Sequence, residues 1–65
     1  MTIHSIVRNA RGWDKQDYFA LKLGISQGYL CNIEKGRRLP SIQTLKKLSK
    51  ITKKPLSYLI LKTYE

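Results

Sequence analysis

The chain has 65 residues, and its 13 lysines and arginines against four acidic residues give a formal net charge of +9. This length allows one small domain, 1–65, and the single cysteine, Cys31, excludes an internal disulfide framework and a Cys-rich zinc site. The basic balance favours a polyanionic partner, with nucleic acid first and an anionic membrane surface second. Neither a signal-peptide pattern nor an apolar stretch near the ~20 residues of a membrane span occurs, so we expect a cytoplasmic protein.

The first two predicted helices are bounded by capping residues and glycines. Thr2 is the expected N-cap of the first helix and Gly12 its stop. Its apolar stripe is Ile3, Ile6, Val7 and Ala10. The second helix is expected to begin near an Asp14 N-cap and to end at Gly24. Its inward residues are Phe19, Ala20 and Leu23, and we expect Trp13 to pack beside Phe19.

Serine caps predict the starts of the third and fourth helices. Ser26 precedes a helix that carries Leu30 and Ile33 inward and closes near Gly36. Ser41 precedes a helix whose expected core stripe is Ile42, Leu45, Leu48 and Ile51. Pro55 introduces a last helix at about 56–62, with Leu59 toward the core. No strand alternation occurs, so the predicted fold class is all-α, a compact domain of five helices.

The segment from Ala20 to Ser26 joins the second and third helices in a way that suits DNA recognition. A small residue four positions before a glycine allows the two helices to approach closely, and the glycine permits a tight turn. On a helical wheel the third helix then points Gly28, Cys31, Asn32 and Lys35 outward, with Gln27 at its tip. Glutamine and asparagine amides pair with adenine in the major groove.

These residues resemble the lambda-repressor/Cro-type helix-turn-helix family, also called the XRE family. The resemblance rests on Ala-x3-Gly-x5-Leu-x2-Ile from Ala20 to Ile33 and Ile-Glu-x-Gly-x3-Pro-Ser from Ile33 to Ser41. It is strongest over residues 16–48 and extends, more loosely, over nearly the whole chain. It implies a lambda-repressor-like fold with a helix-turn-helix at about 16–35. The family usually binds a pseudo-palindrome in duplex DNA as a dimer, with half-sites ~34 Å apart.

The resemblance also assigns roles to individual positions. The positions that match base-contacting residues are Gln27, Gly28 and Asn32. Those that match or neighbour DNA-backbone contacts are Gln16, Ser26, Tyr29, Lys35, Arg37 and Arg38. Glu34 matches a structural glutamate that pairs with an arginine of the first helix, for which Arg8 is the candidate. Gly28 lacks the side chain that often reads a base, so backbone approach or DNA shape is expected to contribute there.

The last helix carries more apolar residues than one small core can cover. The surplus predicts a dimer interface made of Tyr58, Ile60, Leu61 and Tyr64, with a frayed, sticky terminus as the alternative. The lysines of the fourth helix and the turn after it, at 46, 47, 50 and 54, are expected to face water.

Together these features predict a homodimeric, sequence-specific regulator of transcription, most simply a repressor. The alternative is a protein-interaction or adaptor module of the same fold, against which Lys35, Arg37 and Arg38 argue. A membrane-surface protein would need a long amphipathic helix, which the glycine and proline breaks oppose. No acidic pair, nucleophile–base pair or metal-ligand spacing occurs, so we expect no enzyme activity, metal, cofactor or small-molecule ligand.

Overall fold

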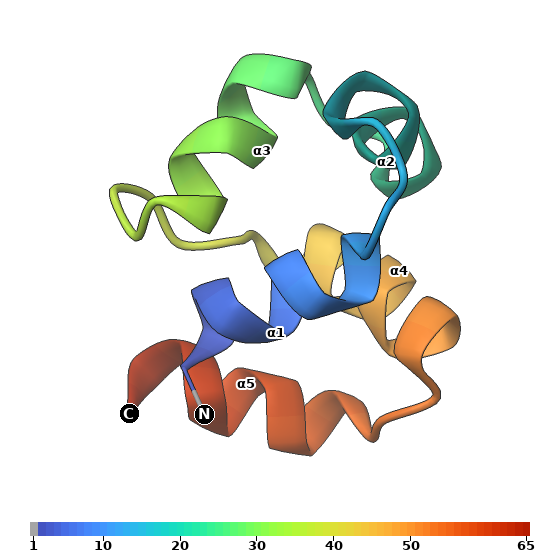
Figure 1. The fold of residues 1–65 in the computed structure, drawn as a ribbon. Helices are drawn as coiled ribbons and strands as arrows, with labels where there is room; N and C mark the ends of the chain where they lie inside the picture. The colour runs from blue at the N-terminus through green and yellow to red at the C-terminus, as the bar shows by residue number, and fades with distance from the viewer. Residues whose placement is uncertain (1) are drawn as a thin grey trace.

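The fold is described by a computed structural model covering residues 2–65, and it consists of five helices (Figure 1). They are α1 (Ile3–Arg11), α2 (Gln16–Leu23), α3 (Gln27–Glu34), α4 (Ile42–Thr52) and α5 (Leu56–Tyr64). No strand occurs within the described residues, so the predicted all-α class is confirmed. The last helix extends two residues beyond the predicted end at 62.

Two serine side chains start α3 and α4 as predicted. The Ser26 hydroxyl accepts a hydrogen bond from the Tyr29 N–H at 3.1 Å, and the Ser41 hydroxyl accepts one from the Thr44 N–H at 3.2 Å. Each bond satisfies a donor that the first turn of a helix leaves without a partner. Thr2 occupies the N-cap position of α1, but its hydroxyl donates to the Ser5 hydroxyl at 3.1 Å rather than capping the helix.

The predicted N-cap of the second helix, Asp14, is wrong, although the helix begins close to it. Lys15 is the N-cap of α2, and Gln16 is the first helical residue. Asp14 instead belongs to the preceding turn, where its N–H donates to the Arg11 carbonyl at 3.0 Å and its carboxylate pairs with Lys22 at 3.2 Å. Because the Asp14 carboxylate pairs with Lys22 of α2, it does not cap the start of that helix.

The same turn overturns the expectation for Trp13. This side chain is fully exposed, whereas Phe19 is fully buried, so the two do not pack together. Trp13 is a central residue of the turn that the bond from Asp14 to Arg11 closes, and central turn residues project into solvent.

Gly24 ends α2 in the left-handed conformation, with φ 71° and ψ 30°. Its N–H donates to the Leu21 carbonyl at 3.1 Å, and the Ile25 N–H donates to the Ala20 carbonyl at 3.0 Å. This pair of bonds is the Schellman arrangement, which favours glycine because a Cβ strains a positive φ. The turn between α2 and α3 is therefore tight, as the sequence predicts.

One apolar core holds the helices together. Its buried members are Ile3, Ile6, Val7, Phe19, Ala20, Leu23, Leu30, Ile33, Leu45, Leu48 and Leu59. The predicted stripe of α4 is only half right, because Ile42 and Ile51 are 43% and 38% exposed. Residues three apart drift by about 60° around a helix, so the ends of a four-residue stripe point to opposite sides. The core takes the middle pair, Leu45 and Leu48.

α1 lies between the other helices and contacts α3, α4 and α5. In Figure 1, α3 lies above α1 and α5 lies below it, so α1 separates these two helices. None of the helices within residues 2–65 has the length and apolar character needed to cross a membrane.

Candidate nucleic-acid interface

The outer face of α3 carries the three residues predicted to contact bases. Gln27 and Gly28 are exposed in the first turn, and Asn32 is half-buried one turn further on. The helix is held in place from behind by Leu30 and Ile33, neither of which is exposed at all. Because its inner side is packed in the core, α3 holds the Gln27 and Asn32 amides of its outer side in a defined position.

A shallow hollow runs between α3 and the loop that follows it. It is lined by Ser26, Gly28, Tyr29, Asn32 and Arg38. The structure therefore brings together five of the nine predicted DNA-contacting residues around one surface feature. The other four, Gln16, Gln27, Lys35 and Arg37, lie outside this hollow.

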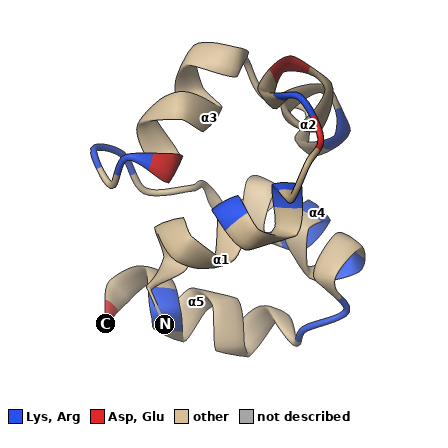
Figure 2. Cartoon of the chain, viewed as in Figure 1, with Lys and Arg blue, Asp and Glu red and all other residues tan. Residues whose placement is uncertain are grey.

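The loop after α3 concentrates positive charge (Figure 2), and one of its arginines, Arg38, lines the hollow. Lys35, Arg37 and Arg38 are all exposed. Gly36, with φ 77°, turns the chain back so that the N–H groups of Arg37 and Arg38 both donate to the Asn32 carbonyl, at 2.9 and 3.3 Å. The turn thus places the backbone of both arginines next to the end of α3.

Tyr29 fastens the far end of the same loop. Its hydroxyl donates to the Leu39 carbonyl at 2.8 Å and accepts from the Ser41 N–H at 3.1 Å. Sequence reasoning assigned this residue to DNA-backbone contact and missed its role inside the chain. Because both bonds use the hydroxyl, Tyr29 ties the end of the loop to α3 beside the hollow that it helps to line.

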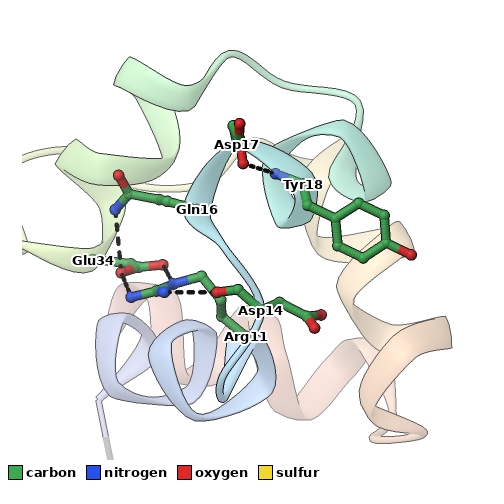
Figure 3. A network of polar contacts seen from close by, with 6 residues as sticks. All are labelled: Arg11, Asp14, Gln16, Asp17, Tyr18 and Glu34. Atoms are coloured by element: carbon green, nitrogen blue, oxygen red, sulfur yellow. Dashed lines mark hydrogen bonds and ion pairs between the residues drawn. The ribbon is translucent and has the colours of Figure 1, made fainter.

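Glu34 joins three helices through one carboxylate (Figure 3). Arg11 donates to it twice, from Nε to Oε2 at 2.7 Å and from Nη2 to Oε1 at 2.9 Å. Gln16 donates from Nε2 to Oε1 at 3.4 Å. The end of α1, the start of α2 and the end of α3 therefore meet at this group. A third guanidinium bond, from Nη1 to the Asp14 carbonyl at 3.0 Å, ties in the turn before α2.

The predicted pairing of Glu34 with Arg8 is wrong, because Arg11 is the partner and Arg8 is exposed. The two arginines are three residues apart and share one side of α1, so helical spacing does not distinguish them. Arg11 is the last residue of α1, closest along the chain to α2, and this position would have been the useful signal. The side-chain hydrogen bond to Glu34 raises the pKa of Arg11, so the guanidinium stays charged.

The pairing has a consequence for the charge of the interface. Glu34 is the single acidic residue between 27 and 39, and it is 4% exposed. Since Arg11 neutralises it inside the protein, the surface of α3 and its loop displays cationic groups without an exposed carboxylate of its own. Gln16 is oriented by the same network, because a carboxylate accepts hydrogen bonds and must be met by the NH₂ side of the amide.

A comparison with known families identifies the arrangement. A family model described as helix-turn-helix matches residues 6–59, which is most of the chain. The chain belongs to this helix-turn-helix family. The resemblance to the lambda-repressor/Cro type is thereby confirmed, and the protein is a DNA-binding helix-turn-helix regulator. No curated protein and no solved structure matches the chain closely enough to indicate a relationship.

Within this helix-turn-helix domain, α5 presents a different kind of surface. Leu59 is fully buried and fixes the helix to the core. Of the residues predicted to form a dimer interface, Tyr58 and Ile60 are half-buried, and Leu61 and Tyr64 are 59% and 66% exposed. The outer side of α5 therefore leaves apolar and aromatic area open to solvent.

Proposed function

We propose that the protein is a homodimeric transcriptional repressor that reads a pseudo-palindromic operator with α3 in the major groove. The observation that carries this proposal is the outer face of α3, where free amide groups stand beside an exposed basic loop. The one acid of this region is turned inward and neutralised. A helix with this surface matches both the base edges of the groove and the phosphates beside it.

Base reading is proposed for Gln27 and Asn32, with Gly28 as the point of backbone approach. Amide side chains donate and accept at once, so Gln27 suits the N6 and N7 atoms of adenine, and Asn32 can donate to an acceptor on a base edge. Contact with the DNA phosphates is proposed for Arg37, Arg38 and Lys35, which are exposed on the loop. The DNA-backbone contacts that fix register are proposed for Gln16 and Ser26, at the starts of α2 and α3. The Tyr29 hydroxyl already donates to the Leu39 carbonyl, so Tyr29 is proposed to hold the loop rather than to bind phosphate.

Homodimer formation is proposed through α5. An interface of Tyr58, Ile60, Leu61 and Tyr64 would cover the apolar area that the monomer leaves exposed. A two-fold axis uses the same patch on both copies, so one helix supplies both sides of the contact. Two α3 helices could then meet half-sites about one helical turn, ~34 Å, apart.

The test is selection from a random duplex library, followed by fluorescence anisotropy with the selected and a scrambled duplex at two salt concentrations. We expect the selected duplex to bind about 10³-fold tighter, with two protomers per site. Asn32→Ala should weaken the selected duplex by about 1–3 kcal/mol and leave scrambled DNA unchanged. Asn9→Ala is the matched control, because Asn9 is an exposed asparagine on α1.

Two results would contradict the proposal. If Asn32→Ala weakens both duplexes equally, Asn32 is not a base reader. If the protein binds neither duplex at low salt, DNA reading itself is rejected, and the adaptor function of the same fold becomes the better explanation.

A further inference from the structure

Of the four glycines, Gly28 alone has a backbone conformation that other residues adopt easily. Gly12, Gly24 and Gly36 have φ of 57°, 71° and 77°, a region that side chains rarely adopt. Gly28 has no such φ, lies in the first turn of α3, and a Cβ built on it would meet nothing within 4 Å. Alanine would fit this position and would favour the helix. Nothing inside the described chain therefore calls for glycine here, which points to something outside it.

More of the surface that lines the hollow around Gly28 is apolar than polar. Gly28 contributes no side chain, and Tyr29 lines the hollow while its hydroxyl is engaged with the loop. The Ser26 hydroxyl accepts from the Tyr29 N–H, so it is turned to the helix end. Two polar side chains remain at the border, Asn32 and Arg38, and within residues 2–65 neither takes part in a side-chain hydrogen bond.

A mainly apolar hollow with an amide donor beside it matches the edge of one particular base in DNA. In the major groove, thymine presents a C5-methyl group next to its O4 acceptor, and no other base edge has this pair. We infer that the hollow over Gly28 receives the methyl group of a thymine while the Asn32 amide donates to its O4. This inference rests on the proposed function, since it requires α3 to lie in the major groove. A Cβ at position 28 would occupy the space that the methyl group needs.

The experiment compares thymine with deoxyuridine, which lacks the methyl group. Wild type and Gly28→Ala are each used to select duplexes from the same random library. Every thymine of the wild-type duplex is then replaced in turn by deoxyuridine. We expect one position in each half-site where deoxyuridine weakens wild type about fourfold, the factor for burying one methyl group. At that position Gly28→Ala should bind the thymine and deoxyuridine duplexes equally.

Two controls separate this effect from damage to the fold. Ser57→Ala changes an exposed residue at the same place in its helix, the second position of α5, a helix that α1 separates from α3. It should keep the fourfold difference between thymine and deoxyuridine. The Tm of Gly28→Ala, followed by circular dichroism, should equal or exceed that of wild type because alanine favours a helix.

The outcomes also distinguish the inference from the function on which it rests. If wild type selects a sequence but binds thymine and deoxyuridine equally at every position, the thymine reading is overturned and the repressor proposal stands. The thymine reading is also overturned, again without loss of the repressor proposal, if Gly28→Ala keeps the wild-type ratio. If wild type enriches no sequence at all, sequence-specific reading fails, and the thymine site fails with it.

Discussion

The surfaces of α3 and α5 depend on the same core but expose opposite chemistry. Both helices are anchored by a leucine with no exposed area, Leu30 in α3 and Leu59 in α5. Beyond the anchor, α3 and its loop present amides and guanidinium groups, whereas α5 presents Leu61 and Tyr64. The comparison shows that packing fixes where a helix lies, while the residues of its outer face decide whether the matching partner is charged or apolar.

The largest expected effect concerns the two leucines that anchor α3 and α5 in the common core. Leu30→Ala and Leu59→Ala should each lower the free energy of unfolding by about 3 kcal/mol, because each leaves a cavity in one well-packed core. Urea denaturation followed by circular dichroism measures both. Markedly unequal losses would mean that the two helices do not depend equally on the core.

The next effect concerns the network that holds α3 against α1 and α2. Glu34→Gln should cost about 2 kcal/mol, because two charge-assisted bonds with Arg11 are weakened at a group that is almost fully buried. Asp14→Asn is the matched control. It removes the ion pair with Lys22, whose partners are 40% and 39% exposed, and should change stability by less than about 0.5 kcal/mol. Similar losses in both variants would contradict the structural role given to Glu34.

A smaller effect separates α5 from the other exposed apolar positions. On the proposed α5 dimer, Leu61→Lys should weaken dimerisation at least about tenfold in sedimentation equilibrium, because a charge would enter the proposed apolar interface. Leu21→Lys places the same charge at an exposed leucine of α2, and it should leave the dimer intact. If both variants dissociate equally, or neither does, α5 is not the dimer interface.

The smallest effect concerns a single guanidinium of the loop after α3. Arg38→Ala should weaken all duplexes alike and reduce the slope of log K against log salt by about 1. Arg8→Ala removes an exposed positive charge from α1, as a control for net charge alone. An unchanged slope in Arg38→Ala would remove Arg38 from the phosphate contacts.

Local chemistry could be predicted from the sequence wherever a short-range rule decides the outcome. The serine caps at Ser26 and Ser41 and the glycine turn at Gly24 depend on neighbouring residues, and all three predictions are confirmed. The helix-turn-helix itself follows from these signals together with the anchors Leu30 and Ile33.

The errors arose where the outcome depends on the rotation of a helix or on a distant partner. Ile42 and Ile51 lie half a turn apart around α4, so both could not face the core. Arg8 and Arg11 share one side of α1, and only the approach of α3 decides which of them reaches Glu34. In both cases the spacing of residues along the chain shows which side chains share a side of the helix. It does not show from which angle a neighbouring helix packs against that side.

The solvent-exposed indole of Trp13 determines which spectroscopic signals are informative. As the single tryptophan, it already has aqueous surroundings in the folded state, so its emission should change little when the chain unfolds. Fluorescence would then underreport denaturation, while the far-ultraviolet helical signal would follow it. The same property makes the emission a quiet background for titrations, in which a blue shift or quenching would report a partner that covers the turn between α1 and α2.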